Sequence, residues 1–286
     1  MDSAGLRELL TFYADAGVDE PLWDAPADRF DETRLEAEQR AASRPQAPQA
    51  PQTQGQTAPS QQAHRKQPSR PAPVAPTAAV PDDAQAARAR EIAASAASLE
   101  ELRAQLEAFD GCNLKTTAKN TVFADGNPQA PIMFVGEAPG RDEDIQGLPF
   151  VGRSGKLLDR ILAAIGLDRS SVYISNVIAW RPPGNRDPSP LETEICRPFI
   201  ERHIELVAPK ILVTLGNPST KLLLRTQTGI MRMRGTWAVH ETPSGLQIPT
   251  MPTLHPAYLL RNPAHKMLAW RDFLAIKQKL EASLKG

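Results

Sequence analysis

The chain has 286 residues, of which 41% are hydrophobic, and its 33 basic residues balance 33 acidic ones. This length allows one sizeable domain with extensions. Two cysteines are too few for a disulfide framework, and the sequence has neither a long apolar run nor an N-terminal signal segment. We therefore expect a soluble cytoplasmic protein with reduced thiols and no membrane contact.

The N-terminal part differs in composition from the rest. Residues 1–39 are acidic, and their apolar positions recur at the spacing of a short amphipathic helix over 4–22. That helix either docks weakly on the chain or is a motif for a protein partner. Residues 40–83 are rich in Pro, Gln and Ala, which predicts an extended linker that buries no core. Residues 84–286 have the composition of a globular domain.

Helical and strand patterns alternate through this globular part. They predict helices over 84–108, 154–166, 190–208, 217–226 and 264–283, and strands over 131–136, 172–179, 210–216 and 248–253. Ser189-Pro190-Leu191-Glu192 is typical of a helix start. The alternation predicts an α/β fold, a three-layer α/β/α sandwich around a central four-stranded parallel sheet.

Acidic residues follow the first predicted strand. The loop Gly136-Glu137-Ala138-Pro139-Gly140 cannot continue as strand, and Glu143 lies just beyond it. Ligands bind at the carboxyl ends of strands in open α/β sheets, so this loop indicates chemistry more than packing. A solvated charge remains the ordinary explanation of Glu143 taken alone.

Three further segments of unusual polar content lie near predicted strand ends: residues 146–155, the pair Ser175-Asn176 with the following 181–186, and residues 254–263. Each has an ordinary explanation alone, such as a core Phe150, a turn Asn176 or a structural His255. Net charge adds little, since residues 82–286 carry 25 basic and 22 acidic residues.

In this order, the four segments resemble family 4 of the uracil-DNA glycosylases over residues 105–284. The motifs are Gly-Glu-Ala-Pro-Gly from Gly136, Pro-Phe-Val-Gly-Arg from Pro149, and His-Pro-Ala-Tyr-Leu-Leu-Arg-Asn-Pro from His255. The resemblance implies an enzyme of base-excision repair that flips uracil out of single- or double-stranded DNA and hydrolyses its N-glycosidic bond. No lysine is placed for a Schiff base, so we expect a monofunctional enzyme.

The resemblance also implies roles for individual residues. Phe150 would form a flat wall for the base, Asn176 would read the edge of uracil, and His255 would donate a hydrogen bond to uracil O2. Glu137 and Glu143 are equal candidates to handle the attacking water. The glycine loop would bind the base through Gly136, Ala138 and Gly140.

DNA contacts are expected from two groups of residues. The segment from Tyr258 through Leu259 and Leu260 to Arg261 fits a wedge that enters the duplex where the base has left, although it also fits the start of a hydrophobic lid helix. Phosphate contacts are expected from the basic residues Arg153, Lys156, Arg181 and Arg186 and the small residues Gly152 and Ser154.

The sequence departs from the family at its cofactor. Family 4 enzymes usually hold a [4Fe–4S] cluster on four cysteines, and the matching positions here are Phe109, Cys112, Trp180 and Cys196. Two ligands are replaced by aromatic residues, so we expect no cluster and no other cofactor. Phe109 and Trp180 would fill the vacated volume, with both cysteines buried.

Two other functions stay open. A noncatalytic relative could hold flipped bases in damaged DNA and recruit partners through residues 1–39. A nucleotide- or phosphate-binding α/β enzyme is weakly indicated by the glycine loop, but the chain has neither a P-loop nor the full dinucleotide-binding fingerprint. We expect a monomer.

Overall fold

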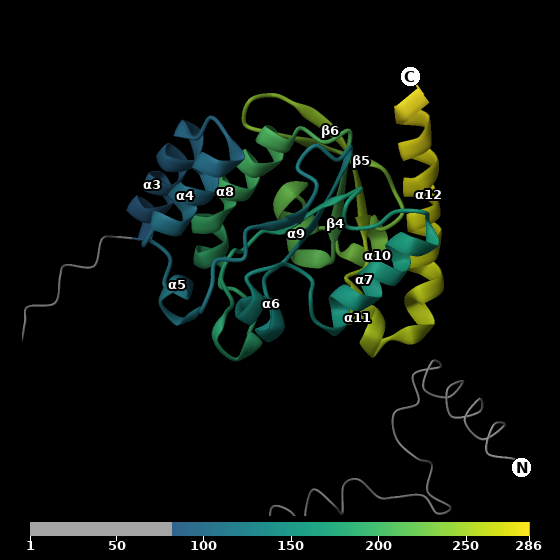
Figure 1. The fold of residues 1–286 in the computed structure, drawn as a ribbon, viewed down its shortest axis with the longest axis horizontal. Coiled ribbons are helices and arrows are strands. Elements are labelled where there is room, and N and C mark those ends of the chain that lie inside the picture. Colours follow the sequence, from purple (N-terminus) through teal and green to yellow (C-terminus); the bar gives the residue numbers. More distant parts are fainter. Residues whose placement is uncertain (1–81, 286) are drawn as a thin grey trace, which may run out of the picture. The chain divides into compact units, whose positions relative to one another are not determined.

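The computed structural model describes residues 82–285 (Figure 1). The predicted helix over 4–22 and nearly all of the predicted linker lie outside the described residues. The globular part begins at Asp82, slightly before the expected boundary. None of the described helices is long and apolar enough to cross a membrane.

The described part of the chain contains ten α-helices, six strands and two short 3₁₀ helices, Pro183–Asn185 and Pro263–His265. The helices are α3 (Asp82–Ser95), α4 (Leu99–Ala108), α5 (Leu114–Thr117), α6 (Arg141–Gln146), α7 (Arg153–Ala164), α8 (Pro190–Val207), α9 (Asn217–Leu223), α10 (Ile230–Met233), α11 (Pro256–Arg261) and α12 (Lys266–Lys285). The strands are β1 (Ala124–Gly126), β2 (Ile132–Gly136), β3 (Tyr173–Asn176), β4 (Ile211–Leu215), β5 (Ala238–Glu241) and β6 (Gln247–Thr253).

The strands form one sheet in the order β1-β3-β2-β4-β6-β5. The inner four are parallel and correspond to the four predicted strands. Antiparallel strands at the two edges, β1 and β5, were not predicted. β1 is the three-residue segment Ala-Asp-Gly. In β5 two of the four residues are exposed and one is only partly buried, so neither edge strand has the apolar pattern of a buried strand.

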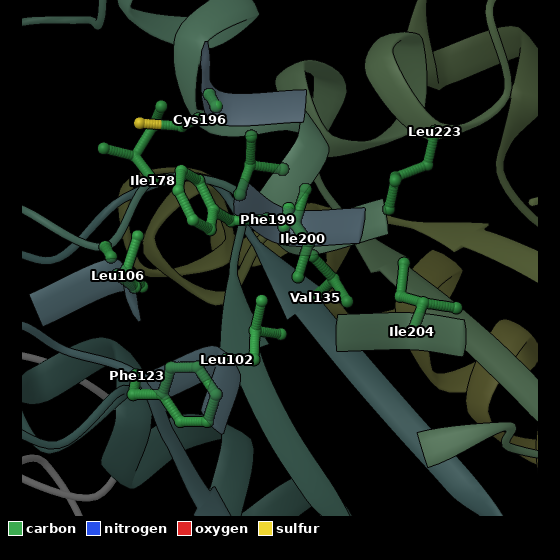
Figure 2. Close-up of a cluster of buried hydrophobic side chains, with 14 of the residues drawn as sticks. Leu102, Leu106, Phe123, Val135, Ile178, Cys196, Phe199, Ile200, Ile204 and Leu223 are labelled. Atoms are coloured by element: carbon green, nitrogen blue, oxygen red, sulfur yellow. The ribbon is translucent and has the colours of Figure 1, made fainter. Parts of the chain in front are cut away.

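Helices cover both faces of this sheet, as predicted. Strand β2 alternates, with Met133 and Val135 in the core on the side of α3, α4 and α8 (Val135 is labelled in Figure 2), and Ile132 and Phe134 in the core on the side of α7 and α12. Figure 1 shows these two groups of helices on opposite faces of the sheet. These four side chains are fully buried. Each contributes roughly 1.5–3 kcal/mol to folding, which holds the carboxyl end of β2 in a fixed position.

The helix predicted over 84–108 is in fact two helices. Ser98 accepts the N–H of Glu101 at 3.2 Å, and the Glu101 carboxylate accepts the N–H of Ala97 at 2.7 Å, so a reciprocal cap begins α4. The Ser-x-x-Glu signal was present in the sequence but missed. The same signal at Ser189 and Glu192 does begin α8 as predicted.

Candidate active site

A cavity of about 490 Å³ lies where the inner strands end. Its walls come from the loops after β2, β3, β4 and β6, which is the ligand-binding edge of a parallel sheet. Eleven of the predicted site residues line it: Glu137, Ala138, Gly140, Glu143, Phe150, Ser154, Asn176, Arg186, His255, Tyr258 and Arg261. Four loops distant in sequence therefore meet in one chamber.

The floor of the cavity is built around Gly136. The β2–β3 register pairs this residue with Asn176. A Cβ atom at position 136 would lie 2.4 Å from Asn176 Oδ1 and 2.6 Å from Phe150 Cζ. Only glycine therefore allows the amide of Asn176 and the ring of Phe150 to approach the strand together.

Asn176 carries an unsatisfied acceptor. Its Oδ1 atom is buried, and no group of the described residues donates a hydrogen bond to it. Leaving such an atom unpaired costs about 1–3 kcal/mol. Buried polar atoms without partners are rare, so this oxygen is suited to accept a hydrogen bond from a ligand.

Phe150 adopts a strained backbone conformation. Its φ of 54° lies in the left-handed region, and its side chain is buried. Such a conformation costs on the order of 1–3 kcal/mol and persists only where the surroundings enforce it. Helix α7 makes room for it at Gly155, because a Cβ there would lie 1.6 Å from the Phe150 carbonyl oxygen.

His255 is held as a neutral imidazole. It caps α11, and its Nδ1 accepts the N–H of Ala257 at 3.1 Å, so the ring proton is on Nε2. Burial, with the nearby charge of Arg261, lowers the pKa of His255 to about 4. Its ring centroid is 5.5 Å from that of Phe150. The side chain is thus a neutral hydrogen-bond donor beside the aromatic wall.

The structure gives the two glutamates different surroundings. Glu143 accepts three backbone N–H groups, from Gly140 at 3.1 Å, Val151 at 3.0 Å and Gly152 at 2.9 Å. Both of its oxygens are therefore engaged in joining the glycine loop to the start of α7. This arrangement favours a structural role over the handling of water that the sequence left open.

Glu137 has the more reactive environment. It lines the cavity half-buried, and burial together with the negative charge of Asp187 raises the pKa of its carboxyl group. A raised pKa makes the carboxylate a better base. Asp187 also lines the cavity, and sequence reasoning missed it because a lone aspartate in an exposed loop has no local signal.

Comparison with known proteins decides the family. A profile of the Uracil DNA glycosylase superfamily matches residues 123–274, more than half of the chain. The chain belongs to the uracil DNA glycosylase superfamily. This agrees with the α/β fold and the four parallel strands predicted from the sequence.

Several similar proteins bear the name Type-4 uracil-DNA glycosylase. Those of Saccharolobus solfataricus and Archaeoglobus fulgidus are each 42% identical to this chain; the matches cover 60% and 63% of this chain and 81% and 92% of the relatives. The protein of Sulfurisphaera tokodaii is 41% identical over 63% of this chain and 84% of its own length.

Leu259 and Gly152, which were both expected to contact DNA, are buried in the protein. Leu259 is 1% exposed and packs with Leu254 and Ala269, so it is a core residue of α11 and not part of a wedge. Gly152 is buried, and Glu143 accepts its N–H, so it presents no group to a phosphate.

The other expected DNA contacts lie at or near the surface. Leu260 is 36% exposed, and Arg153, Lys156 and Arg261 are exposed. Tyr258 bonds through its hydroxyl to His265 Nδ1 at 2.7 Å. Arg186 is exposed, but both of its Nη atoms donate to Glu192 in the first turn of α8. This pair lowers the pKa of Glu192 to about 2 and ties the loop before α8 to that helix.

Packed side chains occupy the four positions at which the sequence resemblance implies cluster cysteines. Phe109 lies 5.2 Å from the ring of Phe199, and Trp180 Nε1 donates to Thr121 Oγ1 at 3.1 Å. Cys112 and Cys196 are buried free thiols with their Sγ atoms 4.0 Å apart (Cys196 is labelled in Figure 2). Two thiols and two buried aromatic rings do not fit a cluster that needs four thiolates.

Proposed function

We propose that this chain is a monofunctional uracil-DNA glycosylase, which hydrolyses the N-glycosidic bond of deoxyuridine in DNA and leaves an abasic site. The observation that carries the proposal is the meeting of Phe150, the unpaired Oδ1 of Asn176 and the neutral ring of His255 in one cavity. The names of the relatives support the same activity.

Recognition of the base depends on Asn176. Its Oδ1 accepts the N3–H of uracil, and its Nδ2 donates to O4. Cytosine presents the opposite pattern at these two positions, so it would leave buried polar atoms unpaired. Phe150 supplies an apolar face for a base that has left the DNA stack.

Bond cleavage depends on charge. As the bond breaks, negative charge gathers on the uracil ring, and the Nε2–H of His255 donates to O2. A donor aimed at developing charge contributes on the order of 3 kcal/mol. A neutral histidine suits this step, since it retains its bond from Ala257 while it donates.

Glu137 directs water to the sugar, and Glu143 holds the loops that shape the site. The environment of Glu137 supports its role as base, because its carboxyl pKa is raised and it faces the cavity. Lysine is absent from the described residues that line the cavity, so hydrolysis leaves the DNA strand uncut.

DNA binding uses the rim of the cavity. Leu260 enters the space that the flipped base leaves, and Arg153, Lys156 and Arg261 bind phosphates without reading sequence. Ser154 and Tyr258 line the passage to the base. We further propose a monomer, because one chain supplies every wall of the cavity. The protein would act in the cytoplasm, with residues 1–39 available to a protein partner.

The chain folds without an iron–sulfur cluster in this proposal. Burial of Phe109 and Trp180 replaces the metal–ligand bonds and contributes roughly 1.5–3 kcal/mol for each side chain. Iron analysis of protein purified without oxygen tests this directly. Less than a tenth of an iron per chain is expected, and about four per chain would end the proposal.

The activity is tested on labelled oligonucleotides that carry uracil, hypoxanthine or xanthine, in single and double strands, with EDTA present. We expect release of uracil and an alkali-sensitive abasic site, without direct strand cleavage. Tight binding of uracil-containing DNA with no base release would favour the noncatalytic damage binder instead.

A further inference from the structure

The strained backbone at Phe150 is held from outside the site. Arg169 lies in the turn before β3, and its Nη1 donates to the carbonyl oxygen of Pro149 at 3.1 Å. Its Nη2 donates to the carbonyl oxygen of Phe150. One guanidinium therefore binds the peptide groups on both sides of Phe150.

Arg169 is itself anchored by two carboxylates. Its Nε donates to Asp159 Oδ1 on α7 at 2.8 Å, and its Nη1 donates to Asp125 Oδ2 on β1 at 2.5 Å. The side chains of Arg169 and Asp125 are only 26% and 27% exposed, which limits the screening of this pair by water. The planar fork of arginine has donors for all four acceptors, whereas the ammonium of lysine has a single centre.

Two residues of helix α7 support the backbone conformation of Phe150. Gly155 and Asp159 lie one helical turn apart, on the same side of the helix. The first leaves room for the Phe150 carbonyl, and the second holds the arginine that binds that carbonyl. A side chain at position 155 would clash with the Phe150 carbonyl, and loss of the Asp159 carboxylate would remove one anchor of Arg169.

We propose that Arg169 is a positioning residue, which fixes the Phe150 backbone so that the aromatic ring stays in the base slot beside Gly136 and Asn176. This inference rests on the proposed function, in which the ring of Phe150 stacks on uracil. Arg169 touches neither the cavity nor the base, so it acts only through Phe150.

The test combines crystal structures with single-turnover excision of uracil from a labelled single-stranded oligonucleotide. The variants are Arg169→Gln, Phe150→Ala and the double substitution. Arg103→Gln is the matched control, because Arg103 forms an exposed ion pair with Glu107 on α4, outside the cavity lining. Arg169→Lys is the second variant if Arg169→Gln does not fold, since its charge still pairs with Asp159 and Asp125.

We expect Arg169→Gln to slow excision about tenfold in the parent and less than twofold in the Phe150→Ala background. Arg169→Lys should slow the parent about threefold. In the Arg169→Gln crystal, Phe150 should have a negative φ and its ring should be displaced from Gly136.

An unchanged φ and ring position at Phe150 in both Arg169 variants would overturn the inference, as would an equal loss of rate with and without Phe150. A parent protein that releases no uracil would contradict the proposed function instead, and the crystal structures would still decide the role of Arg169.

Discussion

Gly136 and Asn176 face each other across neighbouring strands, and a Cβ at position 136 would lie 2.4 Å from Asn176 Oδ1. The atoms nearest to this Cβ belong to the two groups proposed to bind uracil, the amide oxygen of Asn176 and the ring of Phe150. The slot is therefore shaped by the absence of a side chain as much as by those present.

Gly136→Ala should close the slot. We expect at least a tenfold loss in uracil excision, because the methyl group must displace the Asn176 amide or the Phe150 ring. Gly229→Ala is the control, since a Cβ there meets nothing within 4 Å. Single-turnover rates and melting temperatures check this, and a Gly136→Ala protein with parental rates would contradict the geometry of the slot.

Asn176→Asp should weaken the preference for uracil. A carboxylate cannot donate to O4, and an unpaired buried polar group costs about 1–3 kcal/mol, or roughly 5- to 150-fold in rate. The protonated acid can instead pair with cytosine. Excision from matched uracil and cytosine oligonucleotides measures this, and an unaltered ratio of the two rates would argue against readout by Asn176.

His255→Ala should lower turnover by about 10²–10³-fold, with little effect on affinity for DNA that contains no uracil. The pKa of about 4 also predicts that the rate shows no histidine titration near pH 6.5, because the imidazole is already neutral there. A pH–rate profile between pH 5 and 8 checks this. A break near pH 6.5 that disappears in His255→Ala would show that this imidazole gains a proton there, contrary to the prediction.

The two glutamates should separate in a paired experiment. Glu143→Gln replaces one acceptor oxygen by a donor that faces backbone N–H groups, so the melting temperature should fall. Glu137→Gln removes a half-buried charge beside Asp187, so the melting temperature should hold or rise while the rate falls at least tenfold. The reverse pattern would exchange the two roles.

Acid should destabilise the fold through His203. Its ring is buried, stacks on Phe123 and bonds to the Tyr173 hydroxyl, and burial lowers its pKa to about 3. The unfolded chain takes up this proton below pH 6.5, so stability falls by about 1.4 kcal/mol per pH unit from there toward pH 3. Denaturant titrations at several pH values give the free energy of unfolding, which should fall less steeply with decreasing pH in His203→Gln than in the parent. An identical slope would mean that His203 is already protonated in the folded protein.

Sequence patterns predicted the inner sheet well because its strands are buried on both faces. Ile132 to Val135 form a continuous apolar run, and the glycine loop that follows can only be a turn. The segments that meet in the cavity were singled out because they lie near predicted strand ends, and the resemblance to the glycosylase family then implied the roles of their residues.

What the sequence could not give depends on packing between distant segments. Leu259 and Leu260 are neighbours with the same chemistry, and only the docking of α11 decides that Leu259 is the buried one. Three backbone N–H groups donate to Glu143, and Arg169 donates to the Phe150 carbonyl. These bonds join segments that share no sequence motif. Edge strand β1 is too short to have a pattern.

The most direct measurement of the central claim is a crystal structure of the protein soaked with free uracil. The account predicts the ring stacked on Phe150, with N3 within hydrogen-bond distance of Asn176 Oδ1 and O2 on Nε2 of His255. Uracil bound elsewhere on the protein, or a cavity without uracil at a concentration that inhibits excision, would contradict it.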